Sequence, residues 1–141
     1  MSSTLTKNRR AYYDYEVVKS FTAGIVLDGF EVKPIKEGKV SIGEAHCYFK
    51  GNELFVNNMT ITESKHGTTN TPKKLLLNKK ELIELSEKVA QKGLTIIPLK
   101  LFMKQALIKV EIGLCKGKKN FDKRESIKEK DIKRQNDREN I

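Results

Sequence analysis

Residues 40–61 read VSIGEAHCYFKGNELFVNNMTI, and this stretch does most to define the fold. Apolar residues recur on both sides of the short connection Lys50-Gly51-Asn52. Glycine and asparagine tolerate the positive φ angles that tight hairpin turns require. The pattern therefore predicts a β-hairpin whose strands span Val40–Phe49 and Glu53–Ile61.

Further strands are predicted before this hairpin. Short apolar runs at Tyr13–Val18 and Ala23–Leu27 indicate strands, and Asp28-Gly29 is a turn signal. The stretch Phe30–Lys36 is compatible with a short helix or a loop. Pro34 argues against a long helix there, because proline lacks the N–H that an interior helical residue donates.

The chain after the hairpin changes from loop to helix and back to strands. His66–Lys74 is polar and rich in threonine, which predicts a loop. Leu94–Lys104 and Leu107–Leu114 are predicted strands, joined by a turn at Gln105-Ala106.

An amphipathic helix is predicted for Asn78–Lys92. Asn78 is followed three residues later by Glu81, which is an asparagine version of a capping box. Gly93 stands where a helix would end. Apolar residues recur between these ends at helical spacing. They are Leu82, Ile83, Leu85, Val89 and Ala90.

Five or so strands with an inserted helix predict a mainly β fold, a small OB-like antiparallel β-barrel. A β-sandwich is the alternative. We expect residues 1–7 to form a flexible leader and residues 8–115 to form the barrel. Residues 116–141 are highly charged and lack an apolar stripe, so this basic tail is expected to be disordered when free and helical on a partner.

The charge balance points to a polyanionic partner. The chain has 28 Lys and Arg residues against 18 Asp and Glu residues, a formal net charge of +10. Such proteins displace counterions from phosphates. No stretch approaches the roughly 20 apolar residues of a membrane-spanning helix, and no secretory signal is recognisable. We expect a cytoplasmic protein.

Catalytic and metal-binding patterns are not recognisable in the sequence. Cys47 and Cys115 lie far apart, and His46 and His66 do not complete a metal-ligand spacing. Nucleotide-binding, hydrolase and metalloprotease motifs are missing. The expectation is a binding protein that is not an enzyme and needs no cofactor.

An ordered series of short segments resembles one family. It includes Asn8-Arg9-Arg10-Ala11, Phe21–Leu27, Gly29–Lys33, Lys74–Asn78, Lys109–Leu114 and the tail run Lys116–Lys119. The series continues in order to about Lys133 and resembles the SsrA-binding protein (small protein B, SmpB) family. The resemblance implies an OB-like barrel that binds the tRNA-like part of transfer-messenger RNA. It also implies delivery of that RNA to stalled ribosomes for trans-translation, which tags the incomplete peptide and rescues the ribosome.

The resemblance also implies two sets of contact residues in a protein expected to be a monomer. The barrel set would bind RNA, and the tail set would contact the small-subunit decoding region of the ribosome. The barrel residues are Asn8, Arg9, Arg10, Tyr15, Leu76, Asn78 and Lys109. The tail residues are Gly117, Lys118, Lys119, Asp122, Lys123, Arg124 and Lys128.

Structural roles are the alternatives for several of these residues. Leu76 could pack under the helix, Asn78 could serve only as its N-cap, and Tyr15 could be a core or rim aromatic. The family usually has glutamate where this chain has Thr22. The alternative function is that of a ribosomal or translation-factor OB protein that binds ribosomal RNA directly.

Overall fold

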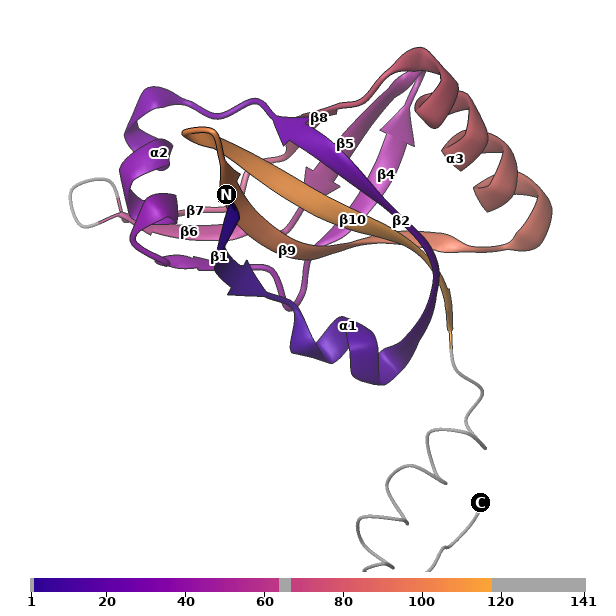
Figure 1. The fold of residues 1–141 in the computed structure, drawn as a ribbon, viewed down its shortest axis with the longest axis horizontal. Coiled ribbons are helices and arrows are strands. Elements are labelled where there is room, and N and C mark those ends of the chain that lie inside the picture. The colour runs from indigo at the N-terminus through magenta and orange to yellow at the C-terminus, as the bar shows by residue number, and fades with distance from the viewer. Residues whose placement is uncertain (1, 64–66, 118–141) are drawn as a thin grey trace, which may run out of the picture.

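The computed structural model describes residues 2–63 and 67–117. Its larger sheet is antiparallel and barrel-like, with the strand order β1-β9-β10-β2-β8-β5-β4 (Figure 1). One further pairing, Cys47 of β4 opposite Ile96 of β9, closes the sheet on itself. The strands are β1 (Ser2–Lys7), β2 (Tyr15–Ile25), β4 (His46–Lys50), β5 (Glu53–Asn57), β8 (Lys73–Leu76), β9 (Thr95–Lys104) and β10 (Leu107–Gly117).

A smaller three-stranded sheet lies beside the barrel. It consists of β3 (Val40–Ser41), β6 (Thr60–Glu63) and β7 (Gly67–Thr69), in the order β3-β6-β7. Helix α2 (Gly29–Lys36) lies at the same side of the molecule in Figure 1.

Strand β9 has two different neighbours along one edge. Residues 100–104 of β9 pair with β1, whereas Ile96 pairs with β4. Pro98 lies between these two segments, where a residue without an N–H interrupts the ladder. The other edge of β9 pairs with β10 along almost its whole length.

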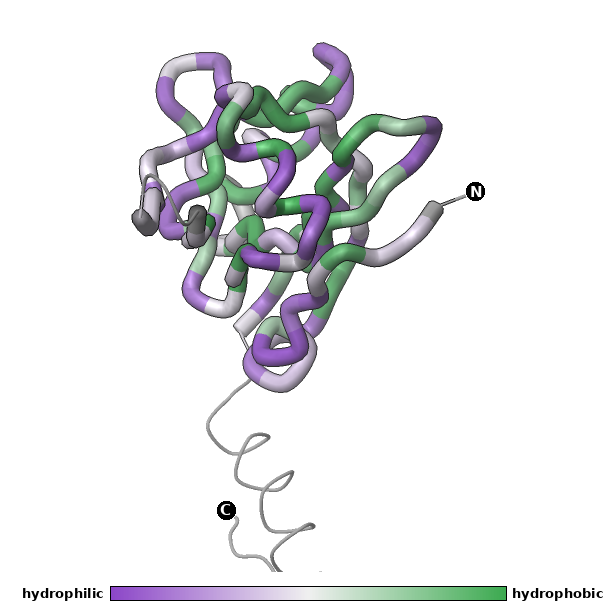
Figure 2. Tube along the Cα trace, turned by 90° about the vertical axis from the view of Figure 1, so that its left-hand side faces the viewer, coloured by the Kyte–Doolittle hydropathy of each residue, from purple (hydrophilic) through white to green (hydrophobic). Residues whose placement is uncertain are grey.

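Aliphatic side chains from alternating strand positions fill the barrel. Leu54, Leu101 and Ile112 are fully buried, while Lys100 and Glu111 lie at outward positions. Successive side chains of a strand point to opposite faces, which explains the alternation. Figure 2 shows hydrophobic residues along the strands and hydrophilic residues in many of the connecting loops.

Helix α3 (Lys79–Lys92) covers one end of the barrel (Figure 1). It ends at Gly93, whose left-handed φ of 65° favours glycine. Leu85 is fully buried against the barrel core. Glu84 accepts from Lys19 of β2 at 2.7 Å and pairs with Lys88 at 3.2 Å, and these contacts lower the pKa of Glu84.

The structure confirms the main predicted elements. The turn at Lys50-Gly51-Asn52 joins β4 and β5, and the predicted helix is α3. The strands predicted for residues 40–49 and 53–61 are each divided, into β3 and β4 and into β5 and β6. Gln105 and Ala106 adopt φ angles of 51° and 65°, so they form the predicted turn between β9 and β10. The fold is mainly β and barrel-like, as expected.

Several local predictions were wrong. Residues 2–7 form β1 rather than a loose leader, because β9 offers them an open edge. The two strands predicted within residues 13–27 are one strand, β2, preceded by a helix, α1 (Arg9–Asp14). Within the predicted loop at residues 66–74, residues 67–69 form β7 and Lys73 begins β8.

Asp28-Gly29 begins helix α2 instead of forming an isolated turn. The backbone N–H of Asp28 donates to Glu31 Oε1 at 2.8 Å, and the N–H of Glu31 donates to the Asp28 carbonyl at 3.0 Å. The Glu31 side chain thus caps the start of the helix, and the Glu31 N–H closes its first turn. Pro34 lies near its C-terminal end, so the helix stays short.

A buried ion pair joins α2 to β8. Glu31 and Lys73 have side chains only 1% and 5% exposed, and Lys73 Nζ lies 2.7 Å from Glu31 Oε2. Lys73 also donates to Thr71 Oγ1 at 2.6 Å. The pair therefore ties the start of α2 to the segment that enters β8.

Both cysteines are buried free thiols. Burial raises the pKa of Cys47 far above its usual value and that of Cys115 to about 11. Since the thiolate is the reactive form, neither residue is suited to nucleophilic chemistry near neutral pH.

Candidate nucleic-acid interface

Two of the predicted RNA-binding residues lie side by side on the outer face of the barrel. Gly24 of β2 pairs with Leu76 of β8 on one side and with Lys109 of β10 on the other. Directly paired residues of antiparallel strands share a face. Leu76 and Lys109 therefore flank Gly24 on the surface, while Ala23, Leu75 and Val110 point into the core.

Gly24 lets the side chain of Leu76 pack closely over the backbone of β2. A Cβ atom at this position would lie 3.4 Å from Leu76 Cβ and 3.5 Å from Leu76 Cδ1. A glycine inside a strand commonly marks a close approach of another molecule to the backbone. The backbone of Gly24 thus lies between an apolar side chain and an ammonium group.

The predicted structural alternative for Leu76 does not apply, because its side chain is 51% exposed. Its neighbour Leu75 is the buried residue of this pair. Lys109 is half-buried, and in the described part of the chain no carboxylate lies within ion-pair distance of it. Both side chains are thus available at the surface.

Asn78 does serve as the N-cap of α3. Its Oδ1 accepts from the backbone N–H of Glu81 at 2.9 Å, and Glu81 Oε1 accepts from the Asn78 N–H at 3.2 Å. Asn78 is nevertheless exposed, two residues beyond Leu76. The cap fixes the position of this residue next to the outer face.

A second set of directly paired residues on the same face runs across β9, β10 and β2, and it contains an acidic residue. Glu111 of β10 pairs with Lys100 of β9 and with Thr22 of β2. Lys100 Nζ lies 3.6 Å from Glu111 Oε1 and 5.5 Å from the centre of the Phe102 ring. Thr22 is exposed there, so the position at which the family usually has glutamate belongs to this face.

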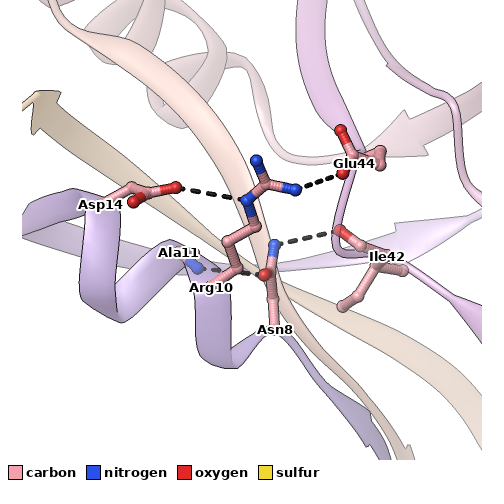
Figure 3. Close-up of polar contacts among 6 residues, drawn as sticks. All are labelled: Asn8, Arg10, Ala11, Asp14, Ile42 and Glu44. Carbon is pink, nitrogen blue, oxygen red and sulfur yellow. Dashed lines mark hydrogen bonds and ion pairs between the residues drawn. The ribbon is translucent and has the colours of Figure 1, made fainter.

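The other predicted RNA-binding residues lie around α1. Asn8 is its N-cap, accepting from the Ala11 N–H at 3.0 Å (Figure 3). Its amide nitrogen donates to the carbonyls of Ile42 at 3.0 Å and Pro98 at 2.9 Å. The side chain is 3% exposed and its donors and acceptor are engaged, so Asn8 holds α1 against β9 and the segment after β3.

Arg9, Arg10 and Tyr15 differ in how available they are. Arg9 is exposed. The guanidinium of Arg10 contacts Asp14 at 3.4 Å and pairs with Glu44 (Figure 3). Tyr15 is half-buried at the start of β2, where it packs against a small apolar cluster, as a rim aromatic would. The cluster consists of Ala11, Ile97, Leu99 and Cys115.

A pocket of about 190 Å³ lies between α1 and the segment before β4. Asn8, Arg10, Tyr15 and Glu44 contribute to its lining. The structure therefore brings three predicted residues together here, apart from the group around Gly24. Among the residues that the structure describes, no cluster of three potential metal ligands exists.

Tyr12 of α1 lies near Glu111 on the outer face. It is 43% exposed on α1, and Lys7 Nζ lies 5.8 Å from its ring centre. Burial and the nearby carboxylate of Glu111 raise the pKa of Tyr12. This tyrosine therefore lies close to the set of paired residues that Glu111 shares with Lys100.

Sequence reasoning did not single out Gly24, Lys100 or Glu111 as parts of an interface. The alternation of buried and exposed residues along each strand could have assigned them to the outer face. Their grouping depends on the register between strands, which alternation leaves open. In the tail set, Gly117 ends β10 opposite Tyr15, whereas Lys118, Lys119, Asp122, Lys123, Arg124 and Lys128 lie outside the described residues.

Comparison with known proteins identifies the family. The family model described as SmpB protein matches residues 5–140. The chain belongs to the SmpB family. The resemblance seen in the ordered sequence segments is thereby confirmed.

Relatives share most of their length with the chain. The SsrA-binding protein of Flavobacterium johnsoniae is 54% identical over 137 residues, which cover 93% of this chain and 91% of the relative. The SsrA-binding protein of Treponema denticola is 43% identical over 140 residues, covering 96% and 91%. A chain from a solved structure called "tmRNA-SmpB: a journey to the center of the bacterial ribosome" matches with a TM-score of 0.67 and 39% identity. That match covers 92% of this chain and 94% of the other.

No helix in the described ranges is long and apolar enough to cross a membrane.

Proposed function

We propose that this member of the SmpB family binds the tRNA-like part of transfer-messenger RNA and delivers it to stalled ribosomes. There it supports trans-translation, in which the incomplete peptide is tagged and the ribosome is released. The protein acts in the cytoplasm as a binding partner rather than as a catalyst. Family membership and the ribosomal complex named for the structural relative support this function.

The observation that carries the proposal is the grouping of Leu76 and Lys109 around Gly24. Lys109 supplies a charge for a phosphate, and the exposed Leu76 supplies an apolar surface for a base or ribose. Gly24 between them carries no side chain that would keep RNA away from the backbone of β2. Asn78 offers an exposed amide at the edge of the same surface.

The α1 group has a different role in this proposal. Arg9 contacts phosphate, while Arg10 and Tyr15 lie beside the pocket at α1. Asn8 acts as a positioning residue, because its amide already bonds to Ile42, Pro98 and Ala11. It orients α1 so that Arg9 and Tyr12 face the RNA.

Substitution of Lys109 tests the barrel surface. Lys109→Ala should weaken binding of the tRNA-like RNA by about 1 kcal/mol or more, roughly fivefold or more, since a charge-assisted contact is lost. The melting temperature should hardly change, because Lys109 points outward. A binding gel, with Lys36→Ala on α2 as the control, measures this effect.

Competing RNAs in the same gel separate the proposed function from its alternative. Fragments of ribosomal RNA and an elongator tRNA serve as competitors. Preference for the tRNA-like RNA supports the proposal, and equal binding of ribosomal RNA favours a ribosomal OB protein. Unchanged affinity in Lys109→Ala would remove this residue from the interface.

Deletion of residues 118–141 tests the tail. The barrel should keep most of its RNA affinity, while peptide tagging on stalled ribosomes should be lost in a reconstituted assay. The reason is that, in this proposal, the barrel binds the RNA and the tail contacts the ribosome. Neutralising Asp122, Lys123 and Arg124 together should reproduce much of the defect. Full tagging by the shortened protein would contradict the proposed role of the tail.

A further inference from the structure

A band of apolar and aromatic side chains crosses the outer face of the barrel next to the interface described above. Tyr48 of β4 pairs with Phe55 of β5, and Phe55 pairs with Lys74 of β8. The N–H of Val26 donates to the Lys74 carbonyl at 2.9 Å, which places Val26 beside Lys74. Lys109 pairs with Gly24 at the end of the β10–β2 ladder, and Leu107 and Val26 each lie two residues beyond that pair at the same end of the sheet.

These residues share the outer face. Their neighbours along the strands, Cys47, Leu54 and Leu75, are buried in the core. Since side chains alternate along a strand, the intervening positions point outward. We call this surface the aromatic band, and it consists of Leu107, Val26, Lys74, Phe55 and Tyr48.

The aromatic band combines apolar exposure with stacked rings. Leu107 and Val26 are 58% and 49% exposed. The rings of Tyr48 and Phe55 are 5.9 Å apart and inclined by 23°, so they form a stacked pair. The ring of His46 follows at 6.4 Å from that of Tyr48. Contiguous apolar surface of this kind usually marks an interaction site.

Charged residues around the aromatic band favour a polyanion. Lys74 lies within it and pairs with Glu53 at 2.5 Å, and Lys50 lies opposite Glu53. Lys104 pairs with Leu107 and Lys109 follows two residues later, so cations line the other end. Four ammonium groups against one carboxylate fit a phosphate backbone better than an acidic or neutral protein surface.

The mixture of rings and cations distinguishes unpaired RNA from a duplex. A duplex hides its base faces and offers mainly phosphates and 2′-hydroxyls. An unpaired strand offers bases that stack on aromatic rings while its phosphates contact lysines. We propose that the aromatic band binds an unpaired RNA segment, with bases against Tyr48 and Phe55 and phosphates near Lys50 and Lys74. This inference rests on the proposed RNA-binding function and extends the interface around Gly24 across β8 to β5 and β4.

Titration of the full chain with short RNAs tests this inference. The probes are an unstructured eight-nucleotide RNA and an eight-base-pair RNA duplex. NMR spectra should show perturbed signals for Tyr48, Phe55 and Val26 with the unpaired RNA and much weaker changes with the duplex. The double substitution Tyr48→Leu with Phe55→Leu should reduce affinity for the unpaired RNA about tenfold or more, because two stacking surfaces are lost.

Phe30→Leu is the matched control, since Phe30 is a 42% exposed aromatic residue on α2, far from β4 in Figure 1. It should bind the unpaired RNA like the unmodified chain. Unperturbed signals at Tyr48 and Phe55, or equal affinity of the double variant, overturn the inference. Self-association that depends on these two rings would assign the band to a second copy of the chain and also overturn it.

The tRNA-like RNA, titrated in parallel, separates this inference from the proposed function. If the unmodified chain binds that RNA but the octanucleotide leaves the aromatic band unperturbed, only the inference fails. If the unmodified chain does not bind that RNA, the proposed function fails. The spectra of the unmodified chain decide the matter even if the double variant does not fold.

Discussion

Replacing Lys73 with methionine is expected to lower the free energy of unfolding by about 3–5 kcal/mol. The reason is that Glu31 would keep a buried charge without its partner, 2.7 Å away in the native protein. Thr71 would also lose the donor to its hydroxyl oxygen. Urea denaturation followed by circular dichroism measures the change.

Two further variants sharpen this test. Adding Glu31→Gln to Lys73→Met should restore much of the stability, because the neutral amide still accepts from the Asp28 N–H. Lys74→Met is the matched control on the next residue, since Lys74 pairs with Glu53 in solvent. Its cost should be within about 1 kcal/mol. A Lys73→Met protein as stable as the Lys74→Met protein would show that the buried pair contributes little.

Asn8→Ala is expected to cost about 3 kcal/mol. Its amide makes three buried hydrogen bonds, to Ile42, Pro98 and Ala11, and the two carbonyls would be left without this donor. Each lost bond is worth about 1 kcal/mol, and buried unsatisfied groups cost more. Thermal unfolding measures the loss, with Asn70→Ala at an exposed position as the control.

Asn8→Ser separates the two functions of this side chain. Serine can still accept from the Ala11 N–H, so it should recover about 1 kcal/mol through the helix cap. It cannot reach both carbonyls as a donor, so the rest of the loss should remain. Weaker RNA binding with unchanged stability in either variant would instead identify Asn8 as a direct RNA contact.

Local sequence signals were sufficient for the central parts of the fold. The residues at Lys50-Gly51-Asn52, the Asn78 and Glu81 capping box and Gly93 act within a few positions of each other. Their effects on the backbone are therefore visible in the sequence, and the structure has the hairpin and α3 where they were predicted. A small barrel was predicted from about five strands, and the barrel-like sheet of the structure contains seven.

Segments stabilised by distant partners were not predictable in this way. Helix α1 has six residues, which is less than two turns and too short to show a repeating apolar pattern. Two of the bonds made by its cap reach residues 34 and 90 positions away. The polar segment 2–7 forms a strand only because β9 offers it an edge. Tertiary contacts determine the secondary structure of both segments, and a single sequence does not show these contacts.

In the candidate site, too, some features were predictable from the sequence and others depend on tertiary contacts. Resemblance to the family selected Leu76 and Lys109, but only the register places them on either side of Gly24. The same reasoning applies to Asn8, whose matching position was read as an RNA contact. Its burial, which no local pattern indicates, supports the positioning role proposed for it.

The divided edge of β9 also bears on solubility. Residues 100–104 read KLFMK, a strand whose backbone groups would form a template for intermolecular pairing if they were uncovered. Strand β1 covers them, and β1 is itself a poor template, because it is short, polar and irregular between Thr4 and Thr6. By pairing with β9, residues 2–7 thus protect the protein from aggregation through this edge. Any tag, cleavage or change near Ser2–Lys7 that loosens this strand would expose the backbone groups of residues 100–104 to pairing with another chain.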